Sequence, residues 1–171
     1  MRLRNLKEKD APLMLEWMHD ELVVKDLRTD FASKTIQDCL SFIECSKDSS
    51  NNLHMAIVDD YDRYLGTCSL KHINHDVHTA ELGITVRAVA MGQGISADAM
   101  RQIIEYGEKE LEIKTVYWCV DPNNLRALRF YDKNGYERID IMSNQMIYRE
   151  AKWGYSAEDI QRYVWYLINQ R

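Results

Sequence analysis

The stretch from Thr79 to Met100, TAELGITVRAVAMGQGISADAM, carries the pattern from which the fold can be predicted. Its first eight residues alternate between apolar side chains and smaller or polar ones, which is typical of a strand with one buried face. The apolar face holds Ala80, Leu82, Ile84 and Val86, and the other face holds Glu81, Gly83 and Thr85. A loop is predicted over residues 87–94, and a helix from about Ser96 to Leu111. The stretch therefore predicts a strand, a loop with two glycines and a long helix.

The loop ends in Gly92-Gln93-Gly94, directly before the predicted helix. A helix N-terminus has unpaired N–H groups and a partial positive charge, and glycines let the backbone approach an anion closely. This junction predicts a phosphate site that needs no cationic side chain. It is not a P-loop, because no Gly-Lys-Ser/Thr follows, and the third glycine of a dinucleotide fingerprint is missing. Taken alone, the two glycines would also suit a tight turn.

The rest of the chain extends this pattern in both directions. Strands are predicted at residues 3–6, 55–58, 64–70, 115–120, 136–141 and 145–150. Further helices are predicted from Asp10, from about Ser33 to Thr35, over 125–133, and from Ser156 to the end of the chain. This order predicts an α+β domain with a central, mixed and mostly antiparallel sheet flanked by helices. We expect residues 1–152 to form this domain, and residues 153–171 to form a C-terminal helix packed on it or at a subunit interface.

Composition limits the classes of protein and partner. The 171 residues suffice for one domain, and 46% hydrophobic with 29% charged residues is typical of a globular protein. No apolar run is long enough to span a bilayer and the first residues lack a signal-peptide core, so we expect a cytoplasmic protein without a membrane partner. Four cysteines without a CxxC pair predict free thiols. A net charge of −5 argues against a nucleic-acid partner and suits a cationic substrate, although it also favours solubility.

A second motif lies between Asn124 and Tyr136, NLRALRFYDKNGY. Together, the two motifs resemble the GNAT acetyltransferase superfamily, in which Arg/Gln-x-x-Gly-x-Gly/Ala follows the fourth strand and Asn-x-x-Ala-x-x-x-Tyr-x-x-x-Gly-Phe/Tyr follows the fifth. The second pattern is matched by Asn124, Ala127, Tyr131, Gly135 and Tyr136. The likeness runs from about residue 1 to 150. Residues 92–99 look most like the branch that includes ribosomal-protein N-terminal acetyltransferases and several small-molecule and amino-sugar acetyltransferases.

The resemblance implies the GNAT fold and acetyl-CoA as co-substrate. It places the cofactor at Thr85, Val86, Gly92, Gln93, Gly94, Ile95, Ser96, Asn124 and Ala127. In this family the amides at the end of the fourth strand, here residues 85 and 86, hold the oxyanion, and the asparagine contacts the pantetheine arm. Asn124 also suits a plain helix cap. Val89 stands where the family has Arg/Gln, so we expect the pyrophosphate to bind through backbone amides, without direct contact from Arg87.

The resemblance also implies the proton-transfer groups. Tyr131 occupies the place of the family's tyrosine acid, which protonates the leaving thiolate; the alternative is a packed aromatic residue. Glu81 is our hypothesis for the base, because related enzymes often carry a glutamate on this strand and a free amine is needed for attack. The alternative for Glu81 is a structural or solvent-facing carboxylate.

Histidines and aromatic residues outside the motifs have simpler interpretations. His72, His75 and His78 are three residues apart, but the segment reads as a polar loop between strands, so no metal site is predicted. The aromatic residues at 153–166 are typical of a core or a subunit interface. Cys119 has no obvious paired base, which argues against an acyl-enzyme.

The predicted function is acetyl transfer from acetyl-CoA to a primary amine by direct attack within a ternary complex. Three acceptors remain open: a protein N-terminus, an amino sugar, or a small amine. The acceptor pocket is expected from residues 20–35 and the loops at 72–78 and 140–155. The alternative function is a non-catalytic acyl-CoA-binding or interaction module on the same fold. A monomer and a homodimer are both compatible with the sequence.

Overall fold

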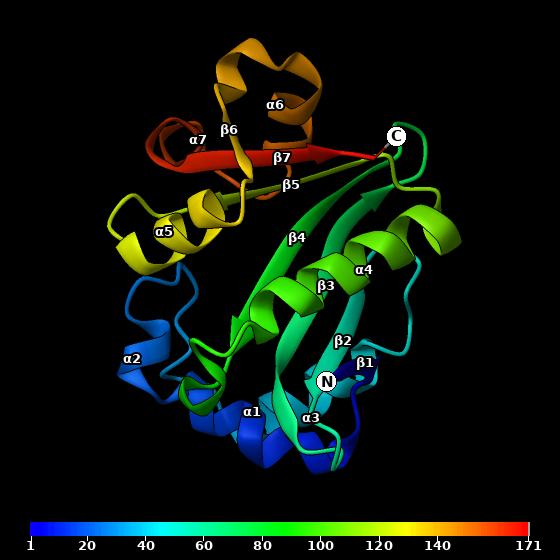
Figure 1. Cartoon of the computed structure of the whole chain (residues 1–171), viewed down its shortest axis with the longest axis vertical. Coiled ribbons are helices and arrows are strands. Elements are labelled where there is room, and N and C mark those ends of the chain that lie inside the picture. The colour runs from blue at the N-terminus through cyan, green and yellow to red at the C-terminus, as the bar shows by residue number, and fades with distance from the viewer. Residues whose placement is uncertain (171) are drawn as a thin grey trace.

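A seven-stranded sheet forms the centre of the computed structural model, which describes residues 1–170 (Figure 1). The strands are β1 (Arg2–Asn5), β2 (Leu53–Val58), β3 (Tyr64–Asn74), β4 (Thr79–Val86), β5 (Thr115–Val120), β6 (Glu137–Ile139) and β7 (Val164–Asn169). Their order in space is β1-β2-β3-β4-β5-β7-β6. The β4–β5 pair is parallel and every other neighbouring pair is antiparallel, which confirms the predicted mixed, mostly antiparallel sheet.

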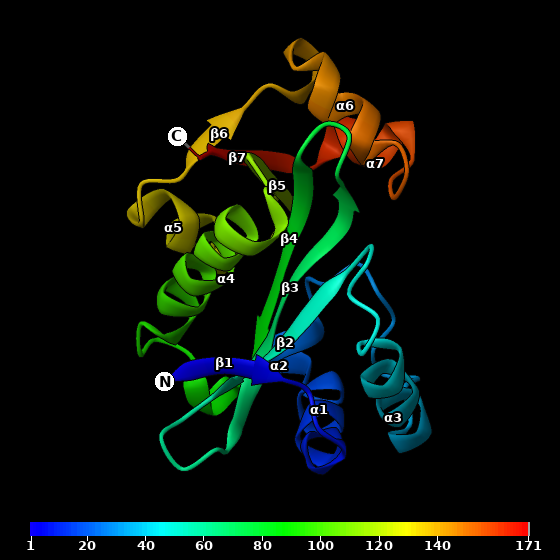
Figure 2. The ribbon, with the colours of Figure 1, turned by 90° about the vertical axis from the view of Figure 1, so that its right-hand side faces the viewer.

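Helices cover both faces of the sheet (Figure 2). One face carries α4 (Ile95–Leu111) and α5 (Leu125–Lys133), and the other carries α1 (Ala11–Met18), α2 (Glu21–Val24) and α3 (Ile36–Cys45). Helix α4 approaches β3 closely at Gly107, where a Cβ would lie 2.7 Å from Leu70 Cδ1. Its buried side chains Met100 and Ile103 join Leu70 in the main hydrophobic core. No helix within residues 1–170 is long and apolar enough to cross a bilayer.

The two parallel strands pair over only part of their length. Thr79, Ala80 and Glu81 pair with residues 115–117, and β4 then continues to Val86 paired only with β3. Because β5 diverges from β4 beyond this point, the backbone of residues 82–86 faces an opening in the sheet (Figure 1). A strand with one unpaired side has N–H and C=O groups available to a ligand.

The prediction of a strand at residues 145–150 is wrong. Residues Gln145–Ala151 form helix α6, and β6 ends at Ile139. The Asn144 side chain caps α6 by accepting from the Ile147 N–H at 3.2 Å. Ile147 and Ala151, four residues apart, are both buried on one side of the helix. The cap and this spacing fix a helix, although the apolar and polar residues over 145–150 also suit a short strand.

The predicted C-terminal helix is also wrong over most of its length. Only Ala157–Arg162 is helical (α7), and Val164–Asn169 forms β7 between β5 and β6. Trp165 and Tyr166, which point to opposite faces, are 2% and 0% exposed. A strand buried on both faces reads as a continuous apolar run, which periodicity alone does not separate from a buried helix. The β-branched and aromatic residues of the run pair in register with all of β5.

Candidate active site

The glycine junction has the geometry expected of an anion site. Gly92 and Gly94 have φ angles of +75° and +77°, and α4 begins at the next residue, Ile95. A Cβ at either glycine would meet nothing within 4 Å, so the backbone lies open to a ligand. Gln93 folds back, and its Nε2 donates to the Val89 carbonyl at 2.6 Å. The positive φ angles are a conformation that glycine adopts without strain.

Arg87 points away from this junction. Its guanidinium forms an ion pair with Glu16 at 2.8 Å and donates to the Tyr64 carbonyl at 3.1 Å. The cations nearest the glycine loop come instead from α5. Arg126, Arg129 and Lys133 line the same cavity as Gly92 and Ser96. These cations are three and four residues apart on the predicted helix, so the sequence itself places them on one face of it.

Two adjoining cavities open beside the unpaired end of β4. The first, of about 400 Å³, is lined by Val86, Gly92 and Ser96, and the second, of about 620 Å³, is lined by Glu81 and Tyr155. Both are lined by Leu27, Ile84, Thr85, Asn124, Ala127 and Tyr131. Thus the structure brings together most of the residues expected at the site, with Thr85 and Tyr131 where the cavities meet. Gln93, Gly94 and Ile95 lie between Gly92 and Ser96 in the chain but do not line either cavity.

Tyr131 is packed tightly and still reaches both cavities. It is 8% exposed, and its ring lies 5.3 Å from Trp118 and 5.1 Å from Tyr166, centroid to centroid. Burial raises the pKa of its phenol above the ordinary value of 10, so the hydroxyl is protonated at neutral pH. This hydroxyl has no hydrogen-bond partner among residues 1–170 and is free to bind a ligand.

Asn124 acts as the helix cap that the sequence allowed. Its Oδ1 accepts from the Ala127 N–H at 3.1 Å, at the start of α5. Asn124 is also buried and lines both cavities, so its Nδ2 group is left to interact with a ligand. The two interpretations of this residue are therefore compatible.

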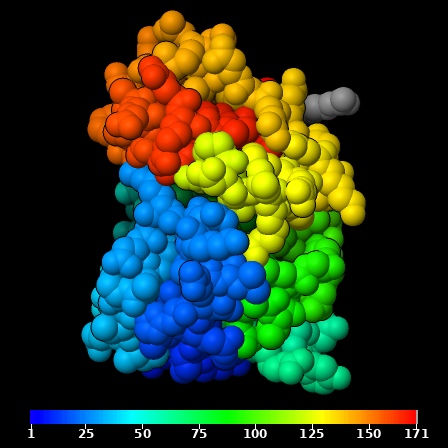
Figure 3. Space-filling view, turned by 90° about the vertical axis from the view of Figure 1, so that its left-hand side faces the viewer, coloured from blue at the N-terminus to red at the C-terminus, as the bar shows by residue number. Residues whose placement is uncertain are grey.

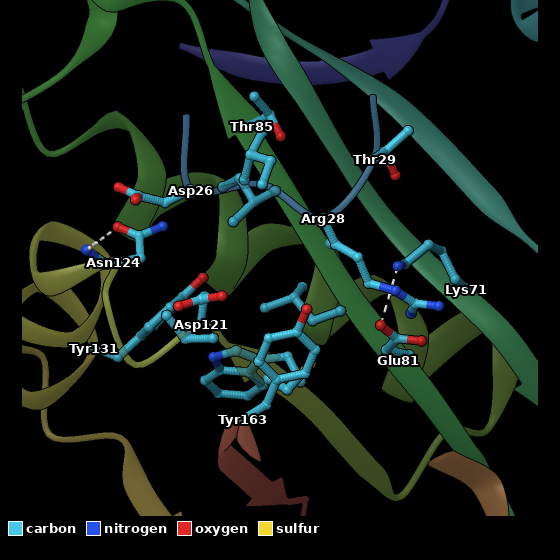
Figure 4. A pocket seen from close by; sticks show the side chains of 18 of the residues that line it. Asp26, Arg28, Thr29, Lys71, Glu81, Thr85, Asp121, Asn124, Tyr131 and Tyr163 are labelled. Atoms are coloured by element: carbon cyan, nitrogen blue, oxygen red, sulfur yellow. Dashed lines mark hydrogen bonds and ion pairs between the residues drawn. The ribbon is translucent and has the colours of Figure 1, made fainter. Parts of the chain in front are cut away.

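Glu81 is a buried carboxylate in a polar cluster. It is 3% exposed and lies directly opposite Lys71 on β3, whose Nζ is 3.1 Å from Oε1. The Tyr155 hydroxyl donates to the same oxygen at 2.5 Å, and His72 Nε2 lies 3.6 Å from Oε2. Burial raises the pKa of Tyr155, which keeps its hydroxyl a donor to this carboxylate. Figure 4 shows Glu81 and Lys71 on one side of the cavity and Tyr131 with Asn124 on the other.

The remaining walls of the second cavity come from segments with no recognisable motif. Arg28, in the loop after α2, lies 4.5 Å from the Tyr155 ring centroid and donates to the Gly154 carbonyl at 2.8 Å. Asp26, in the same loop, is half-buried and accepts no hydrogen bond from residues 1–170. Figure 3 shows that this segment (blue) meets α5 (yellow) and the C-terminal region (red) on one face. These residues fall within two of the segments expected to build the acceptor pocket, 20–35 and 140–155, whereas no residue of 72–78 lines this cavity. The individual contacts had no sequence signal, because the residues lie far apart in the chain.

The three histidines point to different partners. His75 Nε2 lies 3.4 Å from the Ser50 carbonyl and His78 Nδ1 3.0 Å from the Glu112 carbonyl, whereas His72 faces Glu81. Residues 1–170 contain no group of three or more His, Cys, Asp or Glu side chains placed to hold a metal ion. Cys119 lines the second cavity, but burial raises the pKa of its thiol to about 12, so it is not a thiolate at neutral pH.

Comparison with known proteins identifies the family. The sequence profile described as "Acetyltransferase (GNAT) domain" matches residues 1–137. The chain therefore belongs to the GNAT acetyltransferase family. It is an acetyl-CoA-dependent N-acetyltransferase, in agreement with the paired cavities and the two motifs.

Relatives by sequence are distant. An uncharacterised N-acetyltransferase, p20 of Bacillus licheniformis, is 23% identical over 89% of this chain and 85% of its own length. Spermidine N(1)-acetyltransferase of Escherichia coli strain K12 is 27% identical, over 56% of this chain and 54% of its own length. These similarities agree with the family but leave the acceptor of this chain open.

Solved structures share the fold. Spermidine N-acetyltransferase of Vibrio cholerae, in complex with CoA and spermine, superposes with a TM-score of 0.72 at 16% identity, covering 81% of this chain and 82% of that one. A probable acetyltransferase superposes with a TM-score of 0.74 at 20% identity, covering 99% and 92%. The predicted GNAT fold is therefore confirmed.

Proposed function

We propose that this protein transfers the acetyl group of acetyl-CoA to a primary amine by direct attack in a ternary complex, with Tyr131 as acid and Glu81 as base. The observation that supports this most is the meeting of two cavities at the unpaired end of β4. Thr85 and Tyr131 lie at that junction, so a donor in one cavity and an acceptor in the other would meet beside them.

The first cavity suits the donor. Its glycine loop offers the N–H groups at the start of α4 to a pyrophosphate, and the α5 cations add positive charge at its rim. The unpaired side of β4, with Asn124 opposite, suits the amide-containing pantetheine arm. The amides of Thr85 and Val86 would hold the oxyanion as the thioester carbonyl becomes tetrahedral.

Tyr131 suits the acid. The amine nitrogen bonds to the thioester carbon, the C–S bond then breaks, and the electron pair leaves on sulfur as a thiolate. A thiol has an ordinary pKa of about 8.5, so a protonated donor beside the sulfur assists its departure. The Tyr131 phenol is protonated, lines both cavities and has no hydrogen-bond partner among the described residues.

Glu81 suits a base that acts through water. Glu81 and Thr85 point to the same face of β4 and are four residues apart, or about 13 Å along the strand. A glutamate side chain cannot span that length, so we infer that an ordered water carries the amine proton to Glu81. The thiol of Cys119 is protonated, which disfavours an acyl-enzyme route.

Two observations point to different classes of acceptor. One relative and one solved structure named above are spermidine acetyltransferases. Residues 92–99 instead resemble a branch with ribosomal-protein N-terminal, small-molecule and amino-sugar acetyltransferases, which leaves a protein N-terminus and an amino sugar as acceptors. Release of CoA thiol, measured with acetyl-CoA and a panel of polyamines, amino acids, amino sugars and short peptides, tests the proposal. Initial rates with both substrates varied should give intersecting lines. Parallel lines would indicate an acyl-enzyme, and CoA binding without acetylation of any amine would leave a binding module instead.

A further inference from the structure

The second cavity, lined by Glu81 and Tyr155, is the one proposed to take the amine and is called the acceptor cavity here. It contains a cluster of side chains with positive charge. Glu81 is its one buried carboxylate, and Lys71 lies 3.1 Å from it. Tyr155 donates to Glu81 and is covered by the Arg28 guanidinium, 4.5 Å from its ring centroid. One carboxylate between two cations gives this side of the cavity a formal charge of +1. The cavity's other two carboxylates, Asp26 and Asp121, lie on the opposite side, with Asn124 and Tyr131 (Figure 4). The Lys71–Arg28 side therefore favours an anionic group.

Both cations keep unused hydrogen-bond donors. The Lys71 ammonium has three donors and uses one on Glu81, and its side chain is 34% exposed. Arg28 donates to the Gly154 carbonyl, and its side chain is 49% exposed. The carboxylate nearest Arg28 is Asp159, at 3.8 Å, and Asp159 is also paired with an arginine of α7. A carboxylate in the cavity could therefore bind both cations without displacing their partners.

The position of Lys71 sets the distance between an acceptor's amine and its anionic group. Lys71 lies over Gly83, where a Cβ would be 3.6 Å from Nζ. Gly83 is two residues from Thr85, about 7 Å along the strand. In an α-amino acid, one carbon separates the amine from the carboxylate. An amine at Thr85 would thus place such a carboxylate beside Lys71, whereas a polyamine would place a second cation there.

A third cavity, of about 430 Å³, joins the acceptor cavity at this point. Both are lined by Thr29, Phe31, Lys71, Gly83, Ile84 and Thr85. Its inner walls, between β3 and helices α1 and α3, are mostly apolar, with Met14, Trp17, Met18, Phe31 and Phe42. Trp17 and Phe31 contact edge to face, with centroids 4.9 Å apart. An apolar side chain as large as that of phenylalanine fits such a cavity.

We propose that the acceptor is an α-amino acid with a bulky apolar side chain. Its amine meets the thioester at Thr85, its carboxylate binds Lys71 and Arg28, and its side chain enters the cavity between β3 and α1–α3. This inference rests on the proposed acetyl transfer to an amine and names the class of amine.

A matched set of acceptors tests it. L-phenylalanine, L-phenylalaninamide and phenethylamine share a side chain and differ at the carboxylate, while glycine keeps the carboxylate and lacks the side chain. We expect kcat/KM for L-phenylalanine to exceed that of the amide, of phenethylamine and of spermidine by about tenfold or more, because these lack the carboxylate that binds Lys71 and Arg28. Glycine should be poorer by about the same factor, because it leaves the apolar cavity empty. Equal rates for the amide and the acid, or a preference for spermidine, would overturn the proposal.

Two variants locate the subsites. Arg28→Gln should raise KM for L-phenylalanine about tenfold and change KM for phenethylamine less than twofold. Arg63→Gln is the matched control, because Arg63 also lies over a tyrosine ring, that of Tyr61 at 5.7 Å, but outside the cavities. Phe31→Ala should reduce the preference for L-phenylalanine over glycine. If Arg28→Gln affects acid and amine alike, no carboxylate binds there.

The outcomes separate this inference from the proposed function. Acetylation of amines without preference for a carboxylate would reject the amino-acid class and keep the acetyltransferase. Binding of CoA without acetylation of any compound in the panel would reject the proposed function itself.

Discussion

The two sides of the active site differ in how they are built. The proposed donor side is built mainly around two short segments, residues 92–96 and Asn124–Tyr131, and it offers backbone N–H groups at the start of α4. The acceptor side is made of charged and aromatic side chains from β3, β4, the loop after α2 and the turn after α6. Acetyl-CoA is the donor for the whole GNAT family, so its site can be predicted from local motifs. The acceptor site is assembled from residues that lie far apart in the chain.

Loss of the proton donor between the two sides should have the largest effect. We expect Tyr131→Phe to lower kcat by roughly 100-fold or more, because the thiolate would leave unprotonated. KM for acetyl-CoA should change little, since the ring packing is kept. Tyr136→Phe is the control: its ring lies 6.0 Å from Tyr131, but Tyr136 lines neither the donor nor the acceptor cavity. Steady-state rates of thiol release measure both, and equal loss in the two variants would remove the acid role.

Loss of the acceptor-side carboxylate should come next. We expect Glu81→Gln to lower kcat/KM for the amine by roughly 10- to 100-fold. A glutamine cannot accept a proton, so the pH–rate profile of the variant should differ from that of the wild type. Glu150→Gln is the control, since Glu150 is also buried and hydrogen-bonded to Asn74 at 3.1 Å, outside the acceptor cavity. An unchanged pH–rate profile in Glu81→Gln would remove the base role.

A change confined to the donor side should have a smaller effect and a different signature. Gly94→Ala places a side chain at a φ of +77°, which strains the loop and shifts the amides at the start of α4. We expect KM for acetyl-CoA to rise about tenfold, with KM for the amine unchanged. Gly135→Ala has the same φ of +77° and equally open surroundings, but it lies at the end of α5. It should lose similar stability, by thermal unfolding, with no change in KM.

The smallest expected effect concerns stability beside the acceptor side, where His54 on β2 lines the third cavity together with Lys71. Burial, and then the charge of Lys71, lower the pKa of His54 to about 4 from its usual 6.5. Below pH 6.5 the unfolded chain gains a proton at His54 that the folded chain does not, so stability falls as pH decreases from 6.5 to 4. Because the site is partly exposed, we expect a loss of about 1 kcal/mol.

Unfolding of His54→Gln at several pH values measures this contribution. Its stability should depend less on pH between 6.5 and 4 than that of wild type. His75→Gln, at an exposed position in the β3–β4 turn, should keep the wild-type dependence. The same slope in wild type and His54→Gln would show that His54 does not cause it. Backbone amides do not titrate in this range, so the donor side should add no such slope.

The sequence predicts the first six strands and the donor side for a physical reason. Alternation over Thr79–Val86, the glycines before α4 and the cap at Asn124 are local determinants, and here they agree with the tertiary structure. Prediction failed for Gln145–Ala151 and Val164–Asn169, whose patterns suit both a helix and a strand. The contact of Tyr155 with Glu81, 74 residues apart, has no local signal at all.

The interior position of β7 has a consequence for synthesis of the protein. Among the described strands β6 pairs only with β7, and β7 also completes the pairing of β5, with Thr115 opposite Asn169. A nascent chain that has reached β6 therefore exposes the edge of β5 and the face of Trp118, which later stacks on Tyr166 with centroids 5.6 Å apart. Such pairing, with its high contact order, is slow, and an open strand edge invites aggregation. The sheet closes only after β7 has left the ribosome, so Tyr131, whose ring packs 5.1 Å from that of Tyr166, gains its final surroundings late in translation.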